Sequence, residues 1–324
     1  MTLVRWTLPA SLFLLMGCPG SSEDLTEAIL EIEATAYDVC VIDVMDRMHC
    51  ADHYGESWGF EDMVLGSNSY IELDSNQAHM CAIEDNDGDG AGPIHCFKLE
   101  TLGLADSYDV YEGPYTSFSI NQNTLCAIDL DGAVVCPDAV DGSGLESPPE
   151  GVFEDLWTIE HSFVTGGCAL TAGGELECFG DEGFWSYVEA CPLPTEDVVD
   201  MDVGGYPMPI ALTGDGTLQG WSKSKEACVS EVDRGATLVE TGQHVVCTLD
   251  DLGEISCIDI NTDPEDSDVD EDSILENAPE GSYHQLAGNP NNVGMFMCAS
   301  QGHEVSCWGD GWNDGVPQTF DFAD

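Results

Sequence analysis

The chain has 324 residues and carries 63 Asp plus Glu against only 6 Lys plus Arg, a formal net charge of −57 at pH 7. A surface this anionic repels phosphate backbones and acidic lipid headgroups, which excludes a nucleic-acid-binding protein. Salt screens such self-repulsion, so the charge suits folding in a saline environment; attraction of divalent cations or of a basic protein partner is the functional alternative.

Residues 1–17 form a predicted secretory signal. They contain one arginine, a short apolar core and a small residue before Cys18, and the core is too short to remain as a spanning helix. The segment Leu15-Met16-Gly17-Cys18 resembles the bacterial lipobox, which implies cleavage before Cys18 and attachment of a diacylglycerol, with fatty acids such as palmitate, to its sulfur. An ordinary signal peptide with an incidental cysteine is the alternative.

A short polar segment follows the lipobox. Residues 18–27 are predicted to be a lipidated tether that holds the protein in the bacterial cell envelope. Pro19 follows the cysteine, and resemblance to the enterobacterial sorting rule then favours the outer membrane over the inner one.

Apart from Cys18, the chain has fourteen cysteines. They lie within residues 28–324 and are arranged in pairs along the sequence. Six pairs mark the two ends of a predicted hairpin, and Ile210 to Gly220 aligns with the fourth hairpin as a seventh copy without cysteines. The copies start at 40, 81, 126, 168, 210, 247 and 298, a period of about 40–50 residues that is typical of propeller blades. The six expected hairpin pairs are Cys40 with Cys50, Cys81 with Cys96, Cys126 with Cys136, Cys168 with Cys178, Cys247 with Cys257, and Cys298 with Cys307.

The pairing of cysteines sets the register of each hairpin. If Cys126 faces Cys136, then Ile128 faces Val134, and Gly132 occupies the third loop position, where positive φ is required. The same spacing places Gly174, Gly216, Gly253 and Asp46 at that position, and the last hairpin uses the two-residue loop Gly302-His303. Each hairpin then has one apolar, disulfide-bearing face that stacked blades would bury.

Cys191 and Cys228 flank the copy without cysteines, so we expect them to pair across it, with free buried thiols as the alternative. Each short bridge is expected to stabilise the fold by about 2–3 kcal/mol. No Cys-x-x-Cys occurs, which argues against metal binding by these cysteines.

The repeat units resemble those of the regulator of chromosome condensation family, including bacterial propeller-type beta-lactamase inhibitory proteins. The resemblance rests on the units that run from Cys168 to Gly180 and from Cys298 to Gly309, each ending in Phe-Gly or Trp-Gly. It implies a closed, all-β, seven-bladed propeller, with residues 316–322 helping the N-terminal strand to close the ring. We also expect the protein to be a monomer. The family's Gly-Gln-Leu-Gly signature is absent, so no member's activity carries over.

One turn carries a motif for metal binding. Asp85, Asp87 and Asp89 have the alternating spacing of the front half of a calcium loop, followed by Gly90. Cys96 occupies the position where a calcium loop has its bidentate glutamate, and Asp, Asn and Gly are also ordinary turn formers. The sequence therefore predicts either a weak calcium site or a simple turn.

Aromatic residues recur beyond the hairpins. Trp58, Trp185 and Trp312 could together form a partner-binding surface, or could pack between blades. No catalytic residue is predicted: His49 and His53 straddle a strand end, no nucleophile elbow or phosphate loop occurs, and carboxylates are too abundant for a glycosidase pair to be identified.

These patterns predict a non-enzymatic, surface-tethered lipoprotein whose propeller binds a protein or glycan partner. A polysaccharide-acting enzyme with carboxylates at the mouth of the central channel is one alternative. A calcium-dependent adhesion protein is another, with calcium as the sole candidate cofactor.

Overall fold

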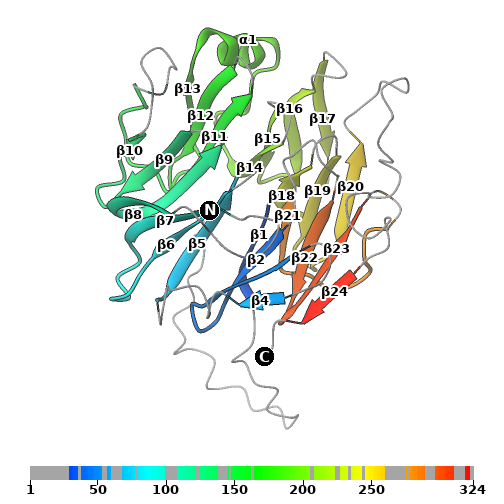
Figure 1. The fold of residues 1–324 in the computed structure, drawn as a ribbon. Coiled ribbons are helices and arrows are strands. Elements are labelled where there is room, and N and C mark those ends of the chain that lie inside the picture. Colours follow the sequence, from blue (N-terminus) through cyan, green and yellow to red (C-terminus); the bar gives the residue numbers. More distant parts are fainter. Residues whose placement is uncertain are drawn as a thin grey trace, which may run out of the picture.

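A computed structural model shows an almost entirely β protein in which short antiparallel sheets are arranged in a ring (Figure 1). The structure describes residues 29–35, 38–52, 57–59, 68–76, 79–98, 108–121, 124–137, 145, 147–161, 164–204, 208–222, 227–232, 235–242, 245–259, 275, 277–288, 296–309 and 318–321.

The first three blades lie in the N-terminal half. Blade 1 consists of β1 (Ile29–Ala34), β2 (Asp38–Asp43), β3 (Met48–Asp52) and β4 (Ser57–Gly59). Blade 2 consists of β5 (Tyr70–Ser75), β6 (His79–Glu84), β7 (Gly92–Lys98) and the first half of β8 (Tyr108–Asn121). Blade 3 consists of the second half of β8, β9 (Thr124–Asp129) and β10 (Val134–Val135). The long strand β8 therefore serves as the outer strand of blade 2 and the inner strand of blade 3.

The other four blades complete the ring. Blade 4 consists of β11 (Asp155–His161), β12 (Val164–Leu170) and β13 (Leu176–Gly180), followed by the helix α1 (Glu182–Ala190). Blade 5 consists of β14 (Val198–Gly204), β15 (Met208–Thr213), β16 (Thr217–Ser222) and β17 (Ala227–Val232). Blade 6 consists of β18 (Ala236–Thr241), β19 (Val245–Asp250) and β20 (Ile255–Asp259). Blade 7 consists of β21 (Gln285–Gly288), β22 (Met297–Gln301), β23 (Glu304–Trp308) and β24 (Gln318–Asp321).

The expected hairpin registers are confirmed. In blade 3, Ile128 faces Val134 across the ladder, as the cysteine spacing predicts. Cysteines of the other hairpins face each other directly in the described ladders: Cys40 faces Cys50, Cys81 faces Cys96, Cys168 faces Cys178, Cys247 faces Cys257, and Cys298 faces Cys307.

The predicted turn residues all have positive φ. A type I turn followed by a bulge places its third residue in the left-handed region, and the two-residue loop of blade 7 requires the same of its first residue. These residues are Asp46 (φ 59), Gly132 (79), Gly174 (78), Gly216 (82), Gly253 (81) and Gly302 (63).

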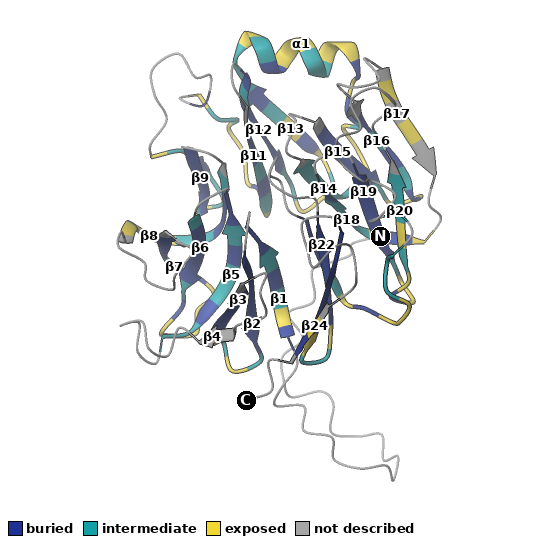
Figure 2. Cartoon of the chain, turned by 45° about the vertical axis from the view of Figure 1, so that its right-hand side comes forward, coloured by how far each residue is buried: buried dark blue, intermediate teal, exposed yellow. Residues whose placement is uncertain are grey.

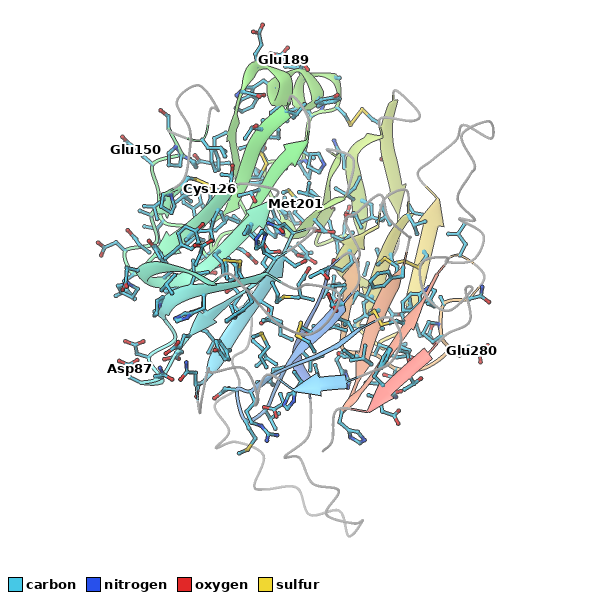
Figure 3. The ribbon with its side chains drawn as sticks, in the orientation of Figure 1. Asp87, Cys126, Glu150, Glu189, Met201 and Glu280 are labelled. Atoms are coloured by element: carbon cyan, nitrogen blue, oxygen red, sulfur yellow. A yellow bond between two sulfur atoms is a disulfide. The ribbon has the colours of Figure 1, made fainter. Side chains whose placement is uncertain are left out.

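All six predicted hairpin disulfides are present, including the one between Cys126 and Cys136, with Cα–Cα distances of 3.9 to 4.1 Å. Sulfur–sulfur bonds are visible across the blades in Figure 3. The structure also joins Cys191 to Cys228, with a Cα–Cα distance of 5.3 Å. This bridge ties the end of α1 to β17, so it connects blade 4 to the outer edge of blade 5.

The hydrophobic core is divided among the seams between blades. The described residues form seven buried clusters, and each draws on two neighbouring blades, as when Cys40 and Met48 of blade 1 meet Leu73 and Phe97 of blade 2. Buried residues accordingly follow the strands, whereas exposed ones lie on turns, on α1 and on outer strands such as β17 (Figure 2). Seven seams require seven blades in a closed ring.

The described part of the segment 316–322 helps the N-terminal strand to close the ring by packing: Phe320 of β24 lies in one buried cluster with Ile29 and Ile32 of β1. The C-terminal strand β24 pairs with β23 and completes blade 7, while β1 pairs with β2 as the inner strand of blade 1. The ring is closed by packing, since β1 contacts β21 and β22 and a single cluster includes Ile32 and Cys298. Among the described strands, β1 and β24 each pair only within their own blade.

Candidate functional site

The turns between the second and third strands of the blades share one face of the ring, which we call the tip face. They comprise residues 44–46, 85–90, 130–132, 172–174, 214–216, 251–253 and 302–303. In five blades the segment leading into the inner strand lies on this face too, because its backbone N–H donates to the tip of the preceding blade. The observed pairs are Tyr70 to Asp46 (2.8 Å), Phe153 to Gly132 (2.9 Å), Val198 to Gly174 (3.1 Å), Tyr283 to Gly253 (2.9 Å) and Ile29 to Gly302 (2.7 Å).

Four inner strands place a carboxyl group at the same register position, directly opposite the first residue of the hairpin. These are Glu33, Asp74, Asp202 and Glu240, which we call the axial carboxylates. A second level lies two residues earlier and includes Glu72 and Asp200. The remaining blades have Ser119, Trp157 and Ala287 at the first level.

The carboxylates of both levels bind the inner strand of the next blade. The edge of an inner strand has no neighbouring strand, so its N–H groups need other acceptors. Asp74 accepts from Ile120 N–H (2.8 Å) and Asp202 from Thr241 N–H (2.6 Å). At the second level, Glu72 accepts from Phe118 N–H (3.0 Å), and Asp200 accepts from Val239 N–H (2.8 Å).

Two further contacts complete this pattern. The Ser75 hydroxyl donates to Glu33 (3.0 Å), and the Thr158 N–H donates to the Ser119 hydroxyl (3.0 Å). Side chains on the inner strands of blades 1, 2, 3 and 5 therefore hold the blade that follows them.

Burial raises the pKa of all four axial carboxylates, because the charged form is poorly solvated near the propeller axis. The pKa of Asp74 rises to about 7 although the Ile120 N–H favours its charged form. The pKa values of Glu33 and Glu240 lie well above the ordinary range, first through burial and then through repulsion by Asp74 and Asp202 respectively. Burial also raises the pKa of Asp202, and the Glu240 carboxyl acts in the opposite direction.

This arrangement can do two things chemically. The aspartates accept hydrogen bonds across the seams: Asp74 accepts from the Ile120 N–H, and Asp202 accepts from the N–H and the hydroxyl of Thr241. Glu240 and Asp202 in addition are interacting buried carboxyl groups whose pKa values are both raised, and paired carboxyl groups are used in general acid–base chemistry.

The structure brings the predicted calcium residues together. Carboxylate oxygens of Asp85, Asp87 and Asp89 lie within 4.8 Å of one another, with Asp85 buried and the other two exposed. Asp87 projects from the turn between β6 and β7 (Figure 3), and repulsion by Asp89 raises its pKa. Asp85 accepts from the N–H groups of Gly88 (2.7 Å) and Gly90 (2.9 Å), which is also how a turn-forming aspartate behaves.

The same turn chemistry recurs in other blades. Asp43, Asp129 and Asp250 each accept two backbone N–H groups of their own hairpin turn. Asp43 also pairs with Arg47 at 2.6 Å and with His49 at 3.2 Å. Although burial acts to raise it, the pKa of Asp43 is lowered by Arg47, whose N–H and guanidinium both donate to the carboxylate. His49 thus has an aspartate partner, and His53 lies outside the described residues.

Of the three tryptophans predicted to form a surface, Trp185 alone has a described side chain. Trp58 lies on β4 opposite Cys50, Trp185 lies on α1 with 39% of its surface exposed, and Trp312 lies outside the described residues. α1 begins where β13 ends, at the opposite end of that strand from its tip turn. The helix starts because Asp181 caps it, accepting from Phe184 N–H at 2.7 Å.

Cys18 and the predicted signal and tether lie outside the described residues. Within the described part of the chain, no helix has the length and apolar character needed to cross a bilayer.

Sequence reasoning missed the axial carboxylates, although a signal was present. In blades 1, 2 and 6 an acidic residue stands seven positions before the first cysteine of the hairpin, at Glu33, Asp74 and Glu240. Ser119 holds the same spacing in blade 3. A repeat alignment extended upstream of the hairpins would have identified this column.

Comparisons with known proteins identify fold relatives only. No protein-family model matches the chain, and no curated protein matches it. Among solved structures, the ectodomain of the Arabidopsis thaliana receptor kinase ACR4 is 13% identical, with a TM-score of 0.43, covering 90% of this chain and 83% of that one.

Two other solved structures are similar. Yeast RCC1 (Prp20) bound to Kap60 is 11% identical, with a TM-score of 0.43, covering 90% of this chain and 75% of that one. The Cps50 (Swd1) beta-propeller domain of Myceliophteria thermophila is 14% identical, with a TM-score of 0.48, covering 78% and 88%. The chain is a β-propeller, and these similarities extend no further than the fold.

Proposed function

We propose that this protein is a surface-tethered bacterial lipoprotein whose propeller is a non-enzymatic, monomeric scaffold for binding a protein or glycan partner. The observation that carries the proposal is the distribution of exposed apolar side chains. Of the seven large hydrophobic residues that are exposed in the described structure, five lie on the tip face: Leu30, Met45, Leu130, Val152 and Leu252. Exposed apolar side chains collected on one face are typical of interaction surfaces.

The proposed tether is compatible with this surface. Ile29, where the described chain begins, lies on the tip face beside Gly302. Ile29 lies eleven positions after the proposed lipidation site Cys18, which corresponds to at most about 36–40 Å of extended chain.

The lipid anchor is tested by metabolic labelling with an alkyne analogue of palmitate in a bacterial host. We expect label and membrane fractionation in the wild type, and loss of both in Cys18→Ala. A wild-type protein that is secreted without label contradicts the anchor. Binding is tested by cross-linking the full chain in its native envelope and identifying the cross-linked species. The absence of any reproducible partner contradicts the scaffold function.

A second candidate is a polysaccharide-acting enzyme, and the pair formed by Asp202 and Glu240 is the observation that favours it. A protonated carboxyl beside a carboxylate could serve as general acid and base. Release of reducing ends from envelope polysaccharides, lost in Glu240→Gln but kept in Asp131→Asn, would support this candidate. The scaffold is preferred because both Asp202 and its neighbour Asp200 already bind the backbone of blade 6.

A further inference from the structure

The tip face carries apolar residues where turn chemistry disfavours them. Turn positions usually hold Gly, Asn, Asp, Ser or Pro. Met45, Leu130 and Leu252 nevertheless stand in the hairpin turns of blades 1, 3 and 6, with exposures of 56%, 60% and 67%. The two exposed hydrophobic residues that lie elsewhere, Val110 and Trp185, reach only 37% and 39%.

These three turns are held rigidly. The Met45 N–H donates to Asp43 at 2.8 Å, and the Leu252 N–H donates to Asp250 at 2.9 Å. The end of each turn is fixed as well, because its last carbonyl accepts an N–H from the following blade. Side chains on a fixed backbone lose little freedom on binding, which favours affinity.

Each of the three exposed turn residues Met45, Leu130 and Leu252 has an acidic neighbour in the sequence. Met45 precedes Asp46, Leu130 precedes Asp131, and Leu252 follows Asp251. Asp131 and Asp251 are exposed. Among Lys and Arg residues, Arg47 alone has a described side chain, and it is paired with Asp43.

Val152 and Leu30 extend the surface. Val152 is 68% exposed and lies over the tip of blade 3, where its Cγ1 is 2.6 Å from the position a Cβ on Gly132 would take. Leu30 is 49% exposed next to the tip of blade 7. The apolar positions thus occur around much of the tip face, within a strongly negative surface.

We propose that the tip face docks a cationic, amphipathic protein surface, with Met45, Leu130 and Leu252 as apolar anchors and the adjacent aspartates pairing with Lys or Arg. This proposal rests on the proposed scaffold function and specifies its partner class. Apolar anchors supply most of the binding energy at such interfaces, and complementary charge supplies orientation and association rate.

The test uses the full chain and a labelled amphipathic helical peptide of leucine and lysine, about five turns long. Binding is followed by fluorescence anisotropy at physiological salt. We expect the triple variant that combines Met45→Ser, Leu130→Ser and Leu252→Ser to bind at least tenfold more weakly than the wild type. The double variant with Val110→Ser and Trp185→Ser, which removes exposed apolar groups elsewhere, is expected to remain within twofold. Circular dichroism and thermal melting confirm that both variants are folded.

Two control ligands separate the alternatives. The first is a peptide in which every leucine is replaced by serine, so that its charge is unchanged. If the wild type binds it as tightly as the leucine–lysine peptide, the interaction is only general electrostatic attraction and the proposal is overturned. Vesicles of zwitterionic lipid test a membrane as the occupant. If the wild type binds these vesicles and the triple variant does not, while the triple variant still binds the peptide, the proposal is also overturned.

Equal peptide affinity in the triple variant and the wild type overturns the tip-face assignment. The scaffold function would survive that result if cross-linking in the envelope still captured a partner. If no cross-linked partner is found and the triple variant binds the peptide as tightly as the wild type, the scaffold function and the tip-face assignment are both rejected.

Discussion

Neutralising one axial carboxylate should change how the stability of the propeller depends on pH. Burial raises the pKa of Asp74 from an ordinary value of 3.8 to about 7. The folded state therefore holds a proton that the unfolded state releases, so the associated stability is complete below pH 3.8 and is lost as the pH rises to about 7. Each pKa unit corresponds to about 1.4 kcal/mol, so the full difference approaches about 4 kcal/mol.

The pH range in which this loss of stability can be measured is narrower than the full range from 3.8 to about 7. The sequence pI is 4.1, and protein solubility falls near that pH, so pH 5 and pH 8 are the useful limits. About two of the three pKa units lie between them, and Asp74 keeps part of its surface in contact with water. We therefore expect the wild type to lose about 2 kcal/mol more free energy of unfolding than Asp74→Asn between pH 5 and pH 8.

Urea unfolding under oxidising conditions, followed by tryptophan fluorescence, measures this difference. Asp131→Asn is the matched control, because it removes one exposed carboxylate from a turn and leaves the propeller axis intact. The control should follow the wild type. If Asp74→Asn and the wild type lose stability in parallel, burial near the axis does not hold the proton, and the reasoning fails.

Three other changes test the seams and the acidic turn. Gly253→Ala should lower the free energy of unfolding by about 2–4 kcal/mol, because φ is +81 and a Cβ would lie 2.5 Å from the backbone of Tyr283, which leads into the following blade. Gly302→Ala is the control, with φ +63 and open space around the Cβ, and should lower it by only about 1 kcal/mol. Equal shifts in the melting temperature of the two variants would contradict this reasoning. Glu72→Leu should cost about 1–3 kcal/mol in urea unfolding by leaving the Phe118 N–H without its acceptor, whereas Glu72→Gln should cost less. Calorimetry should detect calcium binding with a dissociation constant of about 10⁻⁴ to 10⁻³ M that Asp87→Asn abolishes, and no heat in the wild type would leave the motif as a turn.

The hairpins could be predicted from sequence because their determinants are local. A cysteine at each end, as with Cys168 and Cys178, fixes the register, and the loop length then dictates which residue takes positive φ. Gly132 and Asp46 follow from this rule despite their different side chains. Both partners of such a pair lie within about ten residues of each other, so the sequence of the hairpin alone determines its register.

The seams could not be predicted in the same way because their partners lie one repeat apart. Glu72 meets Phe118, 46 positions later, and Asp202 meets Thr241, 39 positions later. Among 63 acidic residues nothing local distinguishes the buried ones from those that only carry surface charge. Helix α1 was also missed, although its cap, Asp181, precedes a run of helix-compatible residues.

The scarcity of cations explains how these buried acids are accommodated. Buried carboxylates usually pair with Lys or Arg, but six such residues cannot serve a ring with this many acids. The inner edge of each blade presents N–H groups that lack a neighbouring strand, and these groups need acceptors as much as the carboxylates need donors. Asp74 and Asp202 satisfy both requirements at once, whereas burial raises the pKa of Glu240 and so favours its neutral form. Backbone N–H groups and protons thus take the place of cations at the seams, which makes ring stability depend on pH.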